Sequence, residues 1–394
     1  MTINSSTSTA VVVVGGGFGG LSTALSLSSC KERPSIFLIE PRPRFVFLPL
    51  LYELLSGELE PWEIAQDYRS LLADKGIVLI DQFVEKIDLD KRIVCTSIGQ
   101  MINFSQLVIS TGSKPEFFGI KGASEYSLMF NKYEDVMKIK ELILRLNSST
   151  KTDQNLVIVG AGSTGVELAC KIGDLLDHKN QIHIIEGQER ILCNGKSFNQ
   201  EQIEQALRKK SIKLHLNTRV LKVHETNLDL INLAESLNSQ FSLSHAGVIW
   251  TAGTKPSFPT GLPQTSLKDG KILINSKLEV LGCENIFAIG DITLDPENPV
   301  PATAQVAMQQ GEHLAKNLIY RRSCKSLTSF QFLDRGEMLS MGIGEATLTG
   351  MGLTLSGSLA FQLRRMTYLS KFPNRSVGIR SAGAWLVSYG KKLI

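Results

Sequence analysis

The sequence predicts an α/β protein with two similar domains, each built on a parallel β-sheet, and a C-terminal segment of different character. Three observations support this fold class: the length of 394 residues, a glycine pattern that occurs twice, and a change in charge near residue 346. At about 150 residues per domain, the length suggests two or three domains. The chain is 43% apolar and 20% charged, which excludes a mainly disordered or fibrous protein.

The repeated pattern consists of an apolar run, the spacing Gly-x-Gly-x-x-Gly and a segment that can form a helix. Its glycines are Gly15, Gly17 and Gly20 in the first copy, and Gly160, Gly162 and Gly165 in the second. The first glycine of each copy permits a tight strand-to-helix turn. The second lets a pyrophosphate approach the backbone, and the third lets the helix pack on the strand. The N–H groups at the start of the helix then favour phosphate.

An acidic residue follows each glycine pattern, at the end of a second apolar run. Glu40 follows residues 36–39, and Glu186 follows residues 182–185. A carboxylate about 20 residues after the glycines binds the ribose hydroxyls of an adenosine. Because the order of strand, glycines, helix, strand and acid occurs twice, we favour two Rossmann-like dinucleotide-binding domains over two acids that merely cap loops. Two such sites in one chain suggest electron transfer between two cofactors.

Several other classes of protein are disfavoured. The formal net charge is only +4, which gives no argument for nucleic acid as a partner. The six cysteines are scattered without a Cys-x-x-Cys pair, so we expect no metal site and no disulfide framework. We also expect no signal peptide and no transmembrane helix, because no basic leader precedes Lys31 and no apolar run reaches 18 residues.

Three further segments make the chain resemble the two-dinucleotide-binding flavoprotein oxidoreductases of glutathione-reductase-like fold. They are residues 107–112, which end in Thr111 and Gly112, residues 248–253, which end in Gly253, and residues 285–291, which end in Gly290 and Asp291. The resemblance implies an FAD-binding domain over residues 1–119 and 258–323, with an inserted NAD(P)H-binding domain over residues 120–257. It adds Phe18 and Asp291 to the FAD contacts.

Two longer segments are similar to type II NAD(P)H:quinone oxidoreductases. One is residues 44–58, with Pro49 and Leu50, and the other is residues 301–311, with Ala304. The continuation through residues 62–65 resembles the cyanobacterial and plastid branch, which includes demethylphylloquinone reductases. The resemblance implies hydride transfer from NAD(P)H to FAD. Electrons then pass to a membrane prenyl quinone without proton pumping. Demethylphylloquinone or another naphthoquinone is expected first, and plastoquinone is the alternative.

Three residues are the candidate catalytic groups. In the resembling family the glutamate of this motif lies near the nicotinamide–flavin junction, so Glu167, expected in the first turn of the second helix, would orient the nicotinamide. The alternative is an acid at a helix start without a special role. Gln305 and Gln309 are four residues apart in a helix expected over residues 303–319, so they share one face, and their amides would bind a quinone carbonyl. Glu186 would repel a 2′-phosphate, so NADH is favoured. NADPH stays an alternative because Arg190 could soften this preference.

The C-terminal segment, residues 324–394, is expected to associate with a membrane surface. From residue 346 onward it carries seven basic residues and no acidic one, among apolar and aromatic side chains. This composition fits a helix lying in a membrane interface, and each basic side chain near anionic lipid would contribute about 1 kcal/mol. We therefore expect a peripheral protein on the cytoplasmic face of a membrane. The alternative is a segment that packs on the protein body or forms a homodimer interface.

Two other functions keep the same fold. One is a flavoprotein reductase that passes electrons to a soluble protein acceptor. The other is a nucleotide-bound redox sensor. A flavin-to-disulfide relay is disfavoured because residues 45–55 contain no cysteine. Sulfide oxidation is disfavoured because the second glycine pattern and Glu186 indicate a nicotinamide site.

Overall fold

The computed structural model describes residues 2–3, 10–151, 154–234 and 239–391. The chain forms two compact units, each assembled from three stretches. The first unit comprises Met1–Phe45, Gln66–Lys114 and Thr254–Leu333, and the second comprises Val46–Ala65, Pro115–Gly253 and Asp334–Ile394. The sequence-predicted borders at 119/120 and 257/258 lie close to two of these borders. Residues 46–65, in contrast, group with the second unit.

The first unit is built on a five-stranded parallel sheet with the order β23-β10-β2-β3-β6. Its strands are β2 (Ala10–Val14), β3 (Ser35–Ile39), β6 (Ile77–Ile80), β10 (Gln106–Ile109) and β23 (Ile286–Ala288). All five residues of β2 are buried. Its alanine and four valines form the continuous apolar run that a parallel strand covered on both faces requires.

Two helices of the first unit cross very closely. They are α1 (Phe18–Ser28) and α9 (Ala304–Arg322). A Cβ atom on Gly311 of α9 would lie 2.4 Å from the carbonyl oxygen of Gly19 in α1. Glycine at this position therefore allows the backbones to touch. The crossing fixes the start of α9 beside the sheet that carries the first glycine turn.

The rest of the first unit consists of short elements. A four-stranded sheet contains β1 (Thr2–Ile3), β7 (Val84–Asp88), β8 (Ile93–Thr96) and β9 (Met101–Asn103), and a three-stranded sheet contains β21 (Leu267–Lys268), β22 (Lys271–Leu273) and β24 (Thr293–Leu294). The short helices are α4 (Tyr68–Leu72), η2 (Gln264–Ser266) and η3 (Gly290–Ile292). Where the chain passes between units it forms β4 (Arg44–Val46), β5 (Ala65–Asp67), β11 (Ser113–Pro115) and β20 (Thr254–Pro256).

The second unit repeats the arrangement of the first sheet. Its five-stranded parallel sheet has the order β12-β19-β13-β14-β15. The strands are β12 (Ser127–Leu128), β13 (Asn155–Val159), β14 (Gln181–Ile185), β15 (Lys213–His215) and β19 (Gly247–Trp250). In both sheets, the strand that precedes the glycine turn is central and pairs with the strand that precedes the acid. The glycine turns therefore lie at the carboxyl ends of central strands, where open α/β sheets bind ligands.

Helices and a second sheet complete the inserted part of this unit. The helices are α5 (Ala123–Tyr126), α6 (Tyr133–Ser148), α7 (Ser163–Leu175) and α8 (Ser197–Lys209), and the antiparallel strands are β16 (Thr218–Val223), β17 (Asn227–Asn232) and β18 (Gln240–Ser244). From the stretch at residues 46–65 come η1 (Leu48–Leu50), α2 (Leu51–Leu55) and α3 (Pro61–Ile64).

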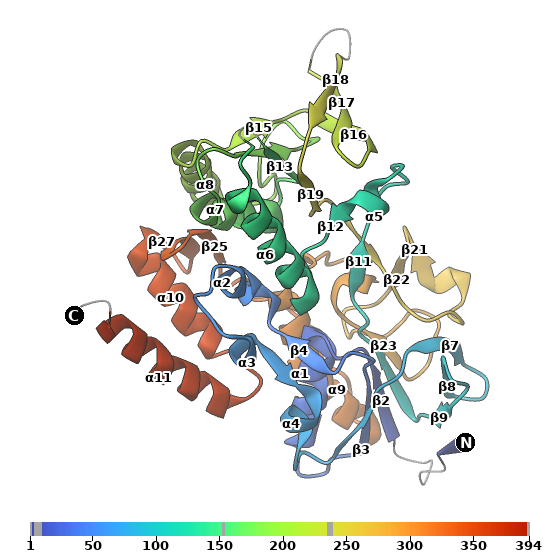
Figure 1. Cartoon of the computed structure of the whole chain (residues 1–394). Coiled ribbons are helices and arrows are strands. Elements are labelled where there is room, and N and C mark those ends of the chain that lie inside the picture. Colours follow the sequence, from blue (N-terminus) through green and yellow to red (C-terminus); the bar gives the residue numbers. More distant parts are fainter. Residues whose placement is uncertain (1, 4–9, 152–153, 235–238, 392–394) are drawn as a thin grey trace. The chain divides into compact units, whose positions relative to one another are not determined.

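The C-terminal stretch belongs to the second unit. It begins with an antiparallel sheet of β25 (Glu337–Gly342), β26 (Glu345–Gly350) and β27 (Leu353–Gly357). Two helices follow, α10 (Ser358–Leu369) and α11 (Arg375–Lys391), which lie side by side as a hairpin (Figure 1). None of the described helices is long and apolar enough to cross a membrane.

Candidate functional site

The first glycine turn connects β2 to α1 and depends on glycine at two positions. Gly15 has φ +97°, a left-handed conformation that side chains rarely adopt. A Cβ atom on Gly20 would lie 1.9 Å from the carbonyl oxygen of Gly15. Gly17 differs, because no atom lies within 4 Å of where its Cβ would be. The turn is thus tight on its inner side and open at Gly17, at the N-terminus of α1 beside Phe18.

The second glycine turn, between β13 and α7, has the same geometry. Gly160 has φ +105°, and a Cβ atom on Gly165 would lie 1.9 Å from its carbonyl oxygen. The space beyond Gly162 is open. Both turns therefore fit the pyrophosphate of a dinucleotide, with an open backbone position at the start of a helix.

The two predicted acids lie beside these turns. Glu40 is only 2% exposed and accepts hydrogen bonds from the N–H of Gly16 at 2.7 Å and from Nε of Arg42 at 2.7 Å. Burial alone would raise the pKa of Glu40, but Arg42 and the backbone N–H donors lower it overall. Glu186 accepts from the N–H groups of Ala161 and Gln188, at 2.6 and 2.9 Å. Each carboxylate is thus fixed against its own glycine turn.

The other predicted FAD contacts of the first unit follow β10 and β23. Gly112 and Gly290 both have positive φ. The carboxylate of Asp291 accepts a hydrogen bond from Oγ of Ser113 at 2.8 Å, so two of these segments meet. Thr111 follows β10, and its Oγ1 is buried without a hydrogen-bond partner among the described residues. A polar atom left in this way is suited to a ligand.

The predicted quinone-binding glutamines lie in the first two turns of α9. This helix is longer than expected: Thr303 caps it, Ala304 is its first residue, and it continues to Arg322. Gln305 and Gln309 share one face, as predicted, with Nε2 of Gln309 3.5 Å from Oε1 of Gln305. The Gln309 amide also makes two hydrogen bonds of 3.0 Å with the backbone of Leu333. Gln309 therefore has a clear structural role.

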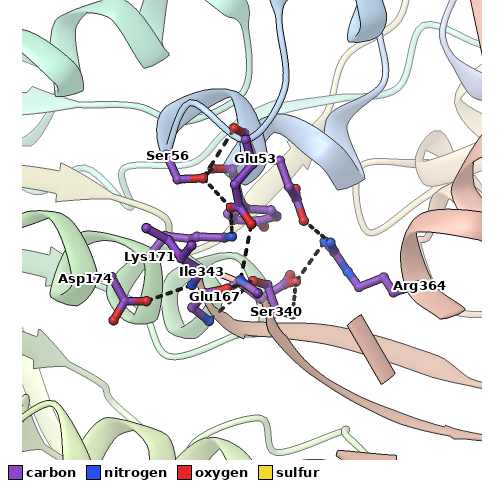
Figure 2. Close-up of polar contacts among 12 residues, drawn as sticks. Glu53, Ser56, Glu167, Lys171, Asp174, Ser340, Ile343 and Arg364 are labelled. Carbon is purple, nitrogen blue, oxygen red and sulfur yellow. Dashed lines mark hydrogen bonds and ion pairs between the residues drawn. The ribbon is translucent and has the colours of Figure 1, made fainter. Parts of the chain in front are cut away.

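A buried charged cluster surrounds Glu167 in the second unit (Figure 2). The guanidinium of Arg364, from α10, forms an ion pair with Glu53 of α2 and lies 3.4 Å from Oε1 of Glu167. Glu167 also accepts the N–H of Ser340 at 2.6 Å. Two carboxylates thus share one cation. Burial raises the pKa of Glu167 to about 7, although Arg364 and the Ser340 N–H act in the opposite direction.

The same cluster continues along α7 (Figure 2). Lys171, which is fully buried, forms an ion pair with Glu58, and Glu58 also accepts the N–H of Gly344 at 3.2 Å. Asp174, one turn further on, accepts the N–H of Ile343 at 2.7 Å. Carboxylates thus hold the turn between β25 and β26 through its backbone N–H groups.

The position of Glu167 differs from the sequence prediction. We expected it in the first turn of the helix, where the helix dipole favours a carboxylate. Because α7 begins at Ser163, Glu167 lies in its second turn, and the first turn contains no acidic residue. The hydrogen bond from Ser340 and the charge of Arg364 hold this carboxylate instead.

Pro49 and Leu50 were expected among the FAD contacts, yet they lie in the second unit as part of η1. Leu50 is fully buried, and the carbonyl oxygen of Pro49 accepts a hydrogen bond from Arg364 at 2.6 Å. Gly253, at the last position of the inserted stretch, has φ +70° and packs against the ring of Phe118.

The C-terminal hairpin corrects one expectation about charge. Arg364 and Arg365 are 1% and 9% exposed, so these two basic side chains point inward rather than toward lipid. The ion pairs described above hold Arg364, and the guanidinium of Arg365 lies 3.7 Å from the ring centre of Trp385. The apolar side chains of Leu359, Met366 and Ile379 are instead 60%, 66% and 74% exposed. Lys392 lies outside the described residues.

Comparisons with known proteins identify the family of this chain. Residues 9–311 match the model of the pyridine nucleotide-disulphide oxidoreductase family. The chain belongs to this family. It is also 34% identical to demethylphylloquinone reductase of Synechocystis over 95% of this chain and 97% of that one. Its identity to the alternative NAD(P)H-ubiquinone oxidoreductase C1 of Arabidopsis thaliana is 30%, over 95% of this chain and 80% of that one. Within the family, it therefore belongs with the type II NAD(P)H:quinone oxidoreductases.

Solved structures show the same fold. NDH2 of Plasmodium falciparum, solved with NADH, has a TM-score of 0.85 at 18% identity and covers 98% of each chain. The sulfide:quinone oxidoreductase of Aquifex aeolicus has a TM-score of 0.77 at 20% identity, over 90% of this chain and 88% of that one. The predicted α/β fold of a two-dinucleotide flavoprotein is confirmed, and so are the enzyme class and the cofactors FAD and NAD(P)H.

Sequence reasoning about this type II oxidoreductase missed several residues. Gln310, 1% exposed, accepts the N–H of Gly290 at 2.7 Å, and the hydroxyl of Tyr68 donates to the carbonyl oxygen of Gly16 at 2.6 Å. Gln310 could have been found in the segment already compared with the family. Glu53 and Arg364, which enclose Glu167, follow no local pattern and are joined only by the fold.

Proposed function

We propose that this chain oxidises NADH through FAD and passes the electrons to a membrane prenyl naphthoquinone, with demethylphylloquinone as the first candidate. The similarity to demethylphylloquinone reductase over 95% of the chain carries this proposal. We assign FAD to the first glycine turn, in the first unit, which differs from the expected domain of residues 1–119 and 258–323 at residues 46–65 and in the stretches near its borders. We assign NAD(P)H to the second turn, in residues 120–257. Plastoquinone is the alternative acceptor.

The two turns would hold the cofactors through the groups described above. Gly17 and Gly162 leave room for the pyrophosphates, and Glu40 and Glu186 are placed to accept the ribose hydroxyls. Bound FAD supplies the redox chemistry, accepting a hydride and releasing electrons. The protein therefore needs no nucleophile, and its own residues serve to bind, orient and hold protons.

Glu167 is proposed to orient the nicotinamide and to hold a proton near neutral pH. Its pKa of about 7 allows the buried carboxyl to carry or release that proton under physiological conditions. Arg364 would set this balance, because its charge favours the ionised carboxylate, while Ser340 fixes Oε1 in place.

Gln305 is the first proposed ligand of the quinone carbonyl, and Gln309 the second. An amide donates a hydrogen bond without placing a further charge near the flavin. We expect Gln305→Ala to raise the KM for quinone. Because the Gln309 amide binds the Leu333 backbone on both its oxygen and its nitrogen, Gln309→Ala should also lower the melting temperature.

Steady-state kinetics of the FAD-loaded protein test the proposed reaction. NADH should reduce the flavin quickly, and turnover should be faster with a short-chain naphthoquinone than with a benzoquinone. Slow flavin reduction would favour the redox sensor. Fast reduction without quinone turnover would favour a soluble protein acceptor.

We further propose that the α10–α11 hairpin lies on the cytoplasmic face of a membrane. Three exposed apolar side chains support this, those of Leu359, Met366 and Ile379, because moving apolar groups from water into the lipid interface lowers the free energy. Deleting the hairpin would be a poor test, since it would remove Arg364 from the buried carboxylates. The better test is a triple variant that combines Leu359→Glu, Met366→Glu and Ile379→Glu.

This variant should lose co-flotation with anionic vesicles and keep its rate with a water-soluble quinone. A variant that still floats with the vesicles would contradict a membrane role for the hairpin. Leu144, 67% exposed on α6, offers a matched control, and Leu144→Glu should leave flotation unchanged. If the hairpin is a homodimer interface, the triple variant should instead change the mass measured by sedimentation.

A further inference from the structure

The loop after Glu186 lies beside an arginine that sequence reasoning did not single out. Arg219, the second residue of β16, is exposed, and its side chain lies along Gly187. A Cβ atom on Gly187 would be 3.5 Å from Cγ and 3.7 Å from Nε of Arg219. The missing side chain at Gly187 thus leaves space that the guanidinium borders.

The backbone fixes this arrangement. The N–H of Thr218, directly before Arg219, donates to the carbonyl oxygen of Glu186 at 2.8 Å, and the N–H of Asn217 donates to that of Gln188 at 2.9 Å. The start of β16 is therefore held by backbone hydrogen bonds to Glu186 and to the loop that follows it. Among the described residues, no acidic side chain forms an ion pair with Arg219.

Arg190, the cation expected to soften the preference for NADH, points elsewhere. Its guanidinium lies 3.4 Å from the carbonyl oxygen of Cys193, within its own loop, and the thiol of Cys193 lies 3.1 Å from the carbonyl oxygen of Arg190. The structure places Arg219, and not Arg190, beside Gly187.

We propose that Arg219 forms a subsite for the 2′-phosphate of NADPH, so that the enzyme uses NADPH as well as NADH. The proposal rests on the assignment of the second glycine turn to the nicotinamide cofactor. The 2′-phosphate is attached to the ribose that Glu186 is placed to bind, and a guanidinium is well suited to bind a phosphate. Glu186 repels the same group, so NADH remains the better substrate, and Arg219 offsets part of that repulsion.

Binding of adenosine fragments tests this subsite without flavin or quinone. We compare adenosine 2′,5′-bisphosphate with 5′-AMP by titration calorimetry, using wild-type protein, Arg219→Gln and the matched control Arg190→Gln. Arg219→Gln should weaken binding of the bisphosphate by about ten-fold or more, the range of a charge-assisted hydrogen bond, and change 5′-AMP less than two-fold. Arg190→Gln should change neither. Because Arg219 is exposed, high salt should weaken binding of the bisphosphate more than binding of 5′-AMP.

Kinetics give a second readout. Arg219→Gln should lower kcat/KM for NADPH by a similar factor and leave kcat/KM for NADH unchanged. Glu186→Gln should raise kcat/KM for NADPH. Equal losses for both fragments would mean that Arg219 stacks on the adenine. The proposal would be overturned by that outcome. It would also be overturned if neither fragment lost affinity in Arg219→Gln, or if neither fragment bound to the wild-type protein. Failure to reduce a quinone would leave the fragment result intact, so the two proposals can fail separately.

Discussion

The raised pKa of Glu167 makes the stability of the second unit depend on pH in a defined direction. The unfolded carboxyl titrates near its ordinary value of 4.5, and the folded one near 7. Between these values the folded state keeps a proton that the unfolded state releases, so stability falls as pH rises. Below pH 4.5 and above pH 7, both states have the same protonation. Glu167 contributes no further change there.

The size of the effect follows from the shift. At about 1.4 kcal/mol per pH unit, a rise from 4.5 to about 7 corresponds to about 3 kcal/mol. Glu167→Gln keeps the oxygen that accepts the Ser340 N–H but cannot titrate. The variant should therefore gain about 3 kcal/mol relative to wild type between pH 4.5 and pH 8.

Urea unfolding of the FAD-loaded protein at a series of pH values measures this difference. In the Arg364→Met background, the gain in stability from Glu167→Gln should depend more strongly on pH, because the cation that lowers the pKa of Glu167 has been removed. A difference between wild type and Glu167→Gln that is flat from pH 4.5 to 8 would refute the assignment of a proton to this carboxyl near neutrality.

Two further predictions concern the cluster and the second glycine turn. Arg364→Met should destabilise the protein by about 3–5 kcal/mol, because it leaves Glu53 buried without its cation, and Arg364→Lys should recover part of this loss in urea unfolding. Gly165→Ala should lower the melting temperature strongly, because its Cβ would meet the carbonyl oxygen of Gly160 at 1.9 Å. Gly162→Ala should keep the melting temperature, because its Cβ meets no atom. It should weaken NADH binding, because the Cβ occupies the space proposed for the pyrophosphate. Equal melting temperatures for the two alanine variants would contradict this distinction.

Local patterns made the fold predictable. An apolar strand, a glycine turn and an acid lie within about 30 residues of each other, so the sequence alone places Gly15 near Glu40 and Gly160 near Glu186. The structure adds hydrogen bonds from the turn N–H groups to each acid. Such contacts depend only on two neighbouring strands and the turn between them.

The charged cluster could not be predicted in this way. Glu53, Glu167, Ser340 and Arg364 come from four separate segments, and each looks ordinary in its own segment. Arg364 illustrates the difficulty, because a basic residue in a stretch without acids suggests a surface charge. Its partner carboxylates are supplied by segments about 200 and 300 residues earlier in the chain, so only the folded chain reveals that it is buried.

The two dinucleotide turns also differ in how firmly their acids are held. In the first, the cationic side chain of Arg42 binds both oxygens of Glu40, and the carboxylate is almost fully buried. In the second, the part of the chain that the structure describes gives Glu186 two backbone N–H donors and no cationic side chain, and this carboxylate is half-buried. A preorganised, enclosed site loses less entropy when its ligand binds, which fits a cofactor that stays on the protein. A more open carboxylate beside an exposed arginine fits one that exchanges at every turnover, and this contrast supports assigning FAD to the first turn and NAD(P)H to the second.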